Sequence, residues 1–220
     1  MREKMSRLKG KKTKIRTTLY NHIINNKREY LIITILFFIG LITSIIFINN
    51  VSDEIFEETN NYLIDLFNNV KSYERVDLFN LFRKSVWNNI IITLLLWFGA
   101  STIIGISIVY GTVALKGFSI GCTISSLINA FGTGNGIIIS LSFLLLHNII
   151  SIPTMFAICV SGVKLYKSIM KNKQKDNIKL EILRHTIFCA IMLLFMVISS
   201  VVEVYLSTNI AIILLKYIKI

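Results

Sequence analysis

The sequence predicts an all-α protein, a polytopic membrane helix bundle with about five transmembrane helices whose central members are broken or kinked. Residues Ile90–Leu115 and Gly117–Leu146 contain no charged side chain, and only Lys116 separates them. A helix needs about 20 predominantly apolar residues to cross a bilayer. Hydrophobic residues make up 54% of the chain, charged residues only 16%, and the mean hydropathy is +0.66. With 220 residues, the chain has room for one membrane domain, 31–220, after a basic tail, 1–30.

The five predicted crossings are apolar runs of helical length, and they are 31–48, 90–115, 117–131, 137–163 and 186–206. The second is long enough to tilt, or to break at Gly105 or Gly111, and the third is short enough to be broken or partly re-entrant. A turn-rich link, 132–136, separates the third from the fourth because three of its five residues are glycine. Pro153 predicts a kink in the fourth crossing, since proline removes one backbone donor from a helix.

The distribution of charge predicts the orientation. Residues 1–30 carry ten Lys or Arg and two acids, 49–89 carry four and seven, and 164–184 carry seven and two. Basic loops remain in the cytoplasm. The N-terminus and the loop 164–184 are therefore expected inside, 49–89 and the C-terminus outside, and Lys116 at the inner face. The net charge of +12 then reflects topology and contacts with membrane lipids rather than with nucleic acid.

The outer segment 49–89 contains apolar residues at helical spacing, among them Leu66 and Phe67. Such stripes are typical of amphipathic helices. Two compatible interpretations remain open: the segment lies on the bilayer surface, or it presents a docking face to a protein outside the membrane.

Small residues recur every fourth position in the third crossing, at Gly117, Gly121 and Ser125. This spacing lets helix backbones approach closely in lipid. Packing inside the bundle is the simpler explanation. The alternative is contact with a second copy of the chain, giving a homo-oligomer, or with a partner's transmembrane helix.

Four polar residues in or beside the apolar runs are candidates for structural or partner-binding roles: Lys116, His147, Asn148 and Glu203. Ionisable groups in hydrocarbon are costly and usually face the bundle interior or a cavity. We expect His147 and Asn148 to bond between helices beside Pro153. Glu203 is expected either at the interface or in a buried contact, and Lys116 to extend toward the cytoplasmic face.

The sequence predicts no catalytic, cofactor-binding or metal site. The three cysteines lie inside apolar runs without metal-ligand or disulfide spacing. Ser107 on one crossing and His147 on another suggest an intramembrane nucleophile and base, but Gly-x-Ser is a weak signal in helices rich in these residues. We therefore expect no enzymatic activity.

Several motifs, taken in order, resemble the stage II sporulation protein M family. They are Trp97-Phe98-Gly99, Ile104-Gly105-Ile106, Leu115-Lys116-Gly117-Phe118-Ser119-Ile120-Gly121, Leu127-Ile128-Asn129, the glycines Gly132 and Gly136, the run from His147 to Pro153, and Glu203 in Val201–Tyr205. No single motif is specific, whereas their order and spacing are. The resemblance covers about 88–165 most strongly.

The resemblance implies a non-enzymatic membrane scaffold. Such a protein would hold two peptidoglycan-degrading partners, stage II sporulation proteins D and P, at the septal and engulfing membrane during sporulation. Lys116, Gly117, Gly121, Asn148, Pro153 and Glu203 would then support the architecture. The alternative function is that of a small membrane transporter or permease component, since broken helices and polar residues at the membrane midplane are typical of transporters as well.

Overall fold

A computed structural model describes the chain over residues 23–52, 54, 56–61, 63–64, 78–102, 105–171, 175–207 and 209–210. The described part is helical and contains no strand, which confirms the predicted all-α class. Its main elements are α2 (Lys27–Asn49), α4 (Leu78–Ala100), α5 (Gly105–Ser140), the π-helical η1 (Leu141–Leu145), α6 (Leu146–Lys171), α7 (Lys175–Val201) and the π-helical η2 (Val202–Ser207). Leu66 and Phe67 lie outside the described residues.

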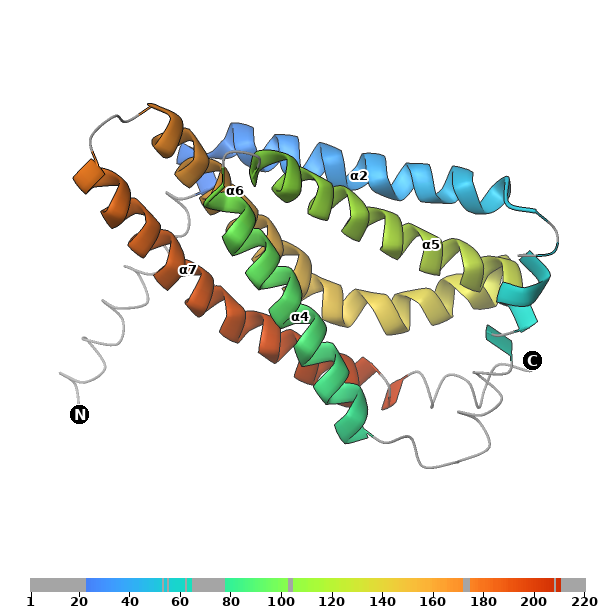
Figure 1. The fold of residues 1–220 in the computed structure, drawn as a ribbon. Helices are drawn as coiled ribbons and strands as arrows, with labels where there is room; N and C mark the ends of the chain where they lie inside the picture. The colour runs from blue at the N-terminus through green and yellow to red at the C-terminus, as the bar shows by residue number, and fades with distance from the viewer. Residues whose placement is uncertain are drawn as a thin grey trace.

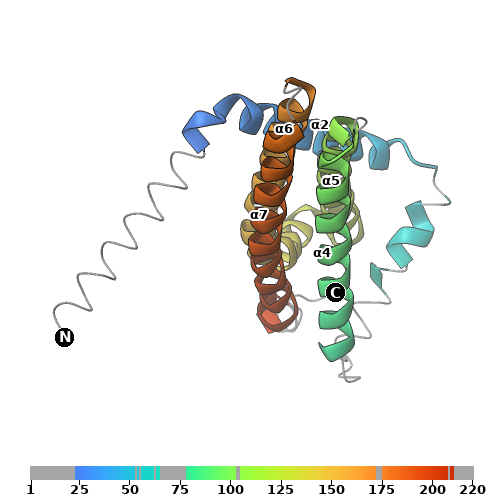
Figure 2. The same ribbon diagram turned by 60° about the vertical axis from the view of Figure 1, so that its left-hand side comes forward.

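The helices cross the bundle in alternating directions (Figure 1). Helix α2 packs mainly on α5, while α6 contacts α7 and α7 contacts α4. Both views show α4 and α7 side by side (Figures 1 and 2). A salt bridge of 2.6 Å between Lys167 and Glu29 joins the C-terminal part of α6 to the N-terminal end of α2.

The most completely buried stretch of the molecule is the middle of α6. Met155, Ile158, Cys159, Val160 and Val163 are at most 1% exposed. Their neighbours come from α2, α4, α5 and α7, so α6 forms the centre of the core. Both Cys159 and the nearby Cys189 are buried free thiols that pack in this core. By contrast, α2 leaves one broad apolar face exposed, which is the face that lipid would cover.

Among the described residues, four helical spans are long and apolar enough to cross a membrane, compared with about five in the sequence prediction. They are Lys27–Asn49, Gly105–Ser140, Leu146–Met170 and Ile178–Leu206. The helix that these four spans leave out is α4. It runs alongside the others, but its first half carries Arg83 and Lys84 as well as Asn88 and Asn89, which lowers its hydropathy.

The predicted boundary at Lys116 is wrong, because α5 continues through this residue without interruption. The helix break lies instead between Ala100 and Gly105. There the hydroxyl of Ser101 donates to the Trp97 carbonyl and that of Thr102 to the Gly99 carbonyl. The Gly99 carbonyl also accepts from the Thr102 N–H, and together these bonds satisfy carbonyls at the end of α4, as a turn next to hydrocarbon requires.

Lys116 therefore does not lie at the end of a helix. Its neighbour Gly117 packs against Phe37, which is close to the midpoint of α2. Lys116 is therefore beside the middle of α2, whereas a place at the inner face would put it level with a helix end. The third crossing is correspondingly longer than predicted, since it begins at Gly105 and continues to the glycine link.

The glycine link itself is confirmed. Gly132 has φ 78° and ψ 165°, values that interrupt the helical path of α5 and that favour glycine. After this turn the chain folds back closely, because a Cβ on Gly136 would meet the backbone of Leu127 and Ile128. Pro153 lies inside α6 as expected, on its exposed side.

The small-residue seam predicted at Gly117, Gly121 and Ser125 is used inside the bundle. A Cβ on Gly117 would overlap the Phe37 carbonyl, and one on Gly121 would overlap the Ser44 hydroxyl. Gly40 of α2 approaches the Ala114 carbonyl in the same way. The backbones of α2 and α5 thus lie in close contact along parallel paths, which favours the internal-packing explanation.

The predicted orientation can be tested by labelling single cysteines in a chain whose native cysteines are replaced. A cysteine at Glu57 or Gly134 should react with an impermeant thiol reagent added to intact cells, because both positions lie on predicted outer segments. A cysteine at Gln174 should react only after the membrane is opened. Labelling at Gln174 in intact cells would contradict the orientation.

Candidate functional site

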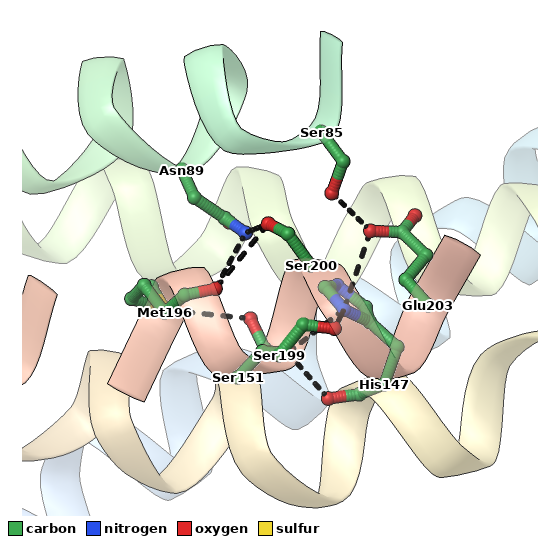
Figure 3. Close-up of polar contacts among 8 residues, drawn as sticks. All are labelled: Ser85, Asn89, His147, Ser151, Met196, Ser199, Ser200 and Glu203. Carbon is green, nitrogen blue, oxygen red and sulfur yellow. Dashed lines mark hydrogen bonds and ion pairs between the residues drawn. The ribbon is translucent and has the colours of Figure 1, made fainter. Parts of the chain in front are cut away.

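The main polar cluster of the bundle joins α4, α6 and the C-terminal end of α7. Figure 3 shows its members pointing toward one another from three helices. Two π-helical segments flank it: η1 ends just before His147, and η2 contains Glu203. A π-helical turn shifts the side chains that follow it relative to an α-helix, and such turns are frequent at functional sites. Here they bring a histidine and a carboxylate to the same place.

Glu203 is held by two helices. The Ser85 hydroxyl of α4 donates to Glu203 Oε2 at 2.5 Å, and His147 Nδ1 lies 3.4 Å from the same oxygen. The Glu203 side chain remains 41% exposed, whereas that of His147 is 9% exposed. Glu203 thus joins η2 to α4 and α6 through its carboxylate, although its side chain is not buried as the predicted buried contact required.

Three hydrogen-bond acceptors surround His147 Nδ1, and they indicate which ring nitrogen of His147 carries the proton. The Ser199 hydroxyl donates to the His147 carbonyl at 3.0 Å, which leaves the Ser199 oxygen free to accept. Nδ1 lies 2.8 Å from that oxygen, 3.3 Å from the Ser199 carbonyl and 3.4 Å from the Glu203 carboxylate. The hydrogen-bond network therefore assigns the proton to Nδ1, which acts as a donor.

This geometry differs from that of an activated serine. In a charge-relay triad the serine and the carboxylate bond to opposite ring nitrogens of the histidine. Here Ser199 and Glu203 approach the same nitrogen. Ser107, the serine that the sequence suggested as a nucleophile, is exposed on α5, and the serine bonded to His147 is Ser199. The cluster therefore joins helices and does not resemble a nucleophile with its base.

A second set of bonds in the cluster connects α4 to α7. The Asn89 amide donates to the Ser200 hydroxyl at 2.8 Å and to the Met196 carbonyl at 3.2 Å. Asn89 and Ser200 are both almost completely buried. Ser151 of α6 contacts the Met196 sulfur at 3.7 Å. Buried polar groups are stable when they are bonded in this way, so the three helices are fixed in one register.

Lys116 contributes the positive charge near this cluster. It lies within electrostatic range of the Glu203 carboxylate, although no described residue forms a hydrogen bond or salt bridge with its ammonium group. A lysine in hydrocarbon is costly, and a nearby carboxylate lowers that cost. Three of the residues singled out in the sequence therefore lie in one region of the bundle.

Asn148 is buried next to His147, with 8% of its surface exposed. Its Oδ1 atom has no hydrogen-bond partner in the described structure. The predicted interhelical bond is therefore present for His147 but not for the Asn148 carbonyl oxygen.

A second histidine, His185, was not identified from the sequence. It is 3% exposed, its Nδ1 lies 2.9 Å from the Ser161 hydroxyl, and its Nε2 lies 3.4 Å from the Cys189 sulfur. Trp97 of α4 donates to Thr186 of α7 at 2.9 Å beside it. This second cluster fixes α4, α6 and α7 near the opposite end of α7.

The two histidine–serine contacts use residues at the same spacing on the two helices. Ser161 follows His147 by fourteen residues on α6, and Ser199 follows His185 by fourteen on α7. Fourteen residues are two heptads, so both partners stay on one face of a helix in a left-handed pair. Because α6 and α7 are antiparallel, each histidine meets the serine of the other helix. This repeated spacing was the signal in the sequence that could have revealed His185.

Within the described residues no group of three or more His, Cys, Asp or Glu side chains is placed to hold a metal ion.

Comparison with known families gives one match. The family model described as stage II sporulation protein M matches residues 33–208. The matched region begins inside α2 and ends just after η2, so it includes both polar clusters and the glycine seam. No curated protein and no solved structure matches the chain.

Proposed function

Because the chain belongs to the stage II sporulation protein M family, and is thus a sporulation-related membrane protein, we propose that it is a non-enzymatic scaffold. In this proposal it holds peptidoglycan-degrading partners, stage II sporulation proteins D and P, at the septal membrane. There the partners remodel the wall during engulfment of the forespore.

The observation that best supports a structural role is that His147 forms hydrogen bonds between helices. Its Nδ1 donates to acceptors on α7 and η2, and its ring is buried. With the proton on Nδ1, the basic nitrogen of the ring is Nε2, and a serine activated by this base would have to bond to Nε2, whereas Ser199 bonds to Nδ1. Nδ1 is committed as a donor, and a serine and a carboxylate share it. His147, Asn89 and Glu203 are thus engaged in contacts between helices, which is what a rigid platform for other proteins requires.

Copurification tests the proposed function directly. A tagged chain extracted in mild detergent from sporulating cells should recover stage II sporulation proteins D and P. A tagged membrane protein of another family, expressed at the same level, should not. Equal recovery of both proteins with the control, or recovery of neither with the tagged chain, would contradict the proposal.

A scaffold and an enzyme also differ in their response to loss of a hydroxyl. We expect Ser107→Ala and Ser199→Ala to retain engulfment at normal membrane levels, and His147→Gln to retain most of it, because an amide can still donate a hydrogen bond. The measurement is the fraction of sporulating cells that complete engulfment. Complete loss in Ser199→Ala and His147→Gln, with normal abundance and thermal stability, would indicate catalysis instead.

One observation favours the transporter alternative. Lys116, His147 and Glu203 come from three different segments and interact electrostatically within the bundle. Charged groups that face a bundle interior often mark an ion or proton path. Reconstitution in vesicles loaded with a pH-sensitive dye would detect such a path as a proton flux that disappears in Glu203→Gln.

A further inference from the structure

A groove of about 230 Å³ opens at the end of the bundle where α2 terminates. It lies between the C-terminal end of α2, the short helical stretch 56–61 and the part of α5 that precedes Gly132 (Figure 1). Its lining residues are Phe47, Ile48, Val51, Phe56, Thr59, Asn60, Ser126 and Asn129. By the predicted orientation this end of the bundle faces the outside of the cell.

The size and chemistry of the groove fit a large side chain followed by peptide backbone. An apolar cavity of about 150 Å³ is sufficient to bind benzene. The present groove is larger and has walls formed by Phe47 and Phe56. Its lining residues also include Ser126, which has a hydroxyl group, and Asn129, which has an amide group. Binding sites typically combine an apolar interior with a few polar groups that orient the ligand.

The segment that forms one wall of the groove is negatively charged, and this charge indicates the sign of the occupant. Residues 50–65 carry five acidic side chains and no lysine or arginine. Glu54, Glu57 and Glu58 are exposed. Complementary charge steers association and selects partners, while like charges repel. An anionic lipid headgroup is therefore disfavoured here, and a segment rich in lysine or arginine is favoured.

We propose that this groove is a docking site for a basic peptide segment of an extracytoplasmic partner protein, which inserts one aromatic or large aliphatic side chain. The identity of the partner as a wall-degrading protein rests on the proposed function. The charge and the apolar anchor of the segment rest on the groove alone.

The binding test uses the full-length chain in phosphatidylcholine nanodiscs. The probe is a fluorescent peptide of sequence Lys-Lys-Leu-Phe-Lys-Lys, and its comparison peptide carries Glu in place of each Lys. The basic peptide should bind and the acidic one should not. Changing Glu54, Glu57 and Glu58 together to Gln should weaken binding about tenfold at low salt, and added salt should weaken binding to the native chain.

A matched pair of variants separates the groove from its surroundings. Asn60 lines the groove, whereas its neighbour Asn61 is exposed and does not. Asn60→Trp should fill the groove and weaken peptide binding about tenfold, and Asn61→Trp should leave it unchanged. Equal affinity for the two peptides, or equal effects of the two tryptophans, would overturn the proposal.

Two further outcomes identify other occupants. Residues 211–220 of the chain itself are apolar and include Lys216 and Lys219. If a chain ending at Ile210 binds the peptide much more tightly than the full chain, this segment is the occupant and the partner proposal is wrong. Displacement of the peptide by phosphatidylglycerol vesicles, with no effect of phosphatidylcholine vesicles, would identify lipid instead and also overturn it.

Failure of this inference and failure of the proposed function can be told apart. If Asn60→Trp recovers stage II sporulation proteins D and P as well as the native chain does, the groove does not hold them, although the scaffold function stands. If the peptide behaves as expected and the native chain recovers neither protein, the groove stands and the scaffold function fails.

Discussion

Replacing Gly117 by leucine is expected to prevent the bundle from assembling. The α2 backbone lies so close to this residue that even a Cβ would overlap the Phe37 carbonyl, and the atoms in conflict are main-chain atoms of a long helix. Inserting atoms into a tightly packed core usually costs about 1–3 kcal/mol, and more where the backbone cannot move. We therefore expect Gly117→Leu to accumulate poorly in the membrane and to lose its thermal transition in detergent.

Gly111 provides a matched control on the same helix. It lies six residues before Gly117, and nothing lies within 4 Å of the place where its Cβ would be. Gly111→Leu should accumulate normally and melt at the native temperature. Similar behaviour of the two variants would show that the α2–α5 contact is not formed as described.

The charge of Glu203 should be coupled energetically to that of Lys116. Glu203→Gln keeps an oxygen that can accept from Ser85 but removes the negative charge near the Lys116 ammonium. An unpaired charge in a membrane-spanning bundle is costly, so this variant should be markedly destabilised. In a chain that already carries Lys116→Met, the same Glu203→Gln change should cost less.

A double-mutant cycle measures this coupling. Unfolding of the native chain, both single variants and the double variant in mild detergent gives the interaction free energy, expected at about 0.5–3 kcal/mol. Glu181→Gln is the control, because Glu181 forms an exposed contact with Arg184 away from the cluster. A coupling energy near zero between Lys116 and Glu203 would show that Lys116 is stabilised by another group.

Much of the fold was predictable because hydrophobic runs and charge blocks are local properties of a sequence. The first crossing, predicted at 31–48, agrees with α2, and the glycine link agrees with the turn at Gly132. Lys116 misled the prediction because a charge inside an apolar run usually marks a loop. In the structure a carboxylate within electrostatic range of Lys116 is that of Glu203, which is distant in the sequence. The actual break, after Ala100, gives little sign in the sequence. Its polar side chains are two hydroxyls, and these bond to carbonyls of the preceding helix.

The candidate site was predictable in its members but not in its connections. Lys116, His147 and Glu203 stood out as costly groups in hydrocarbon, and the structure brings all three together. Ser85 and Ser199, which bond to Glu203 and His147, are ordinary polar residues whose roles follow only from packing. The π-helical segments that aim His147 and Glu203 have no clear sequence signature.

The scaffold proposal is tested most directly by the amount of wall-degrading protein at the septum. Fluorescently labelled stage II sporulation proteins D and P can be imaged in sporulating cells that contain the chain and in cells that lack it, at equal total levels. The proposal predicts that septal fluorescence of both proteins falls sharply without the chain and is restored by the native chain and by Ser107→Ala. Unchanged septal fluorescence in cells that lack the chain would contradict it.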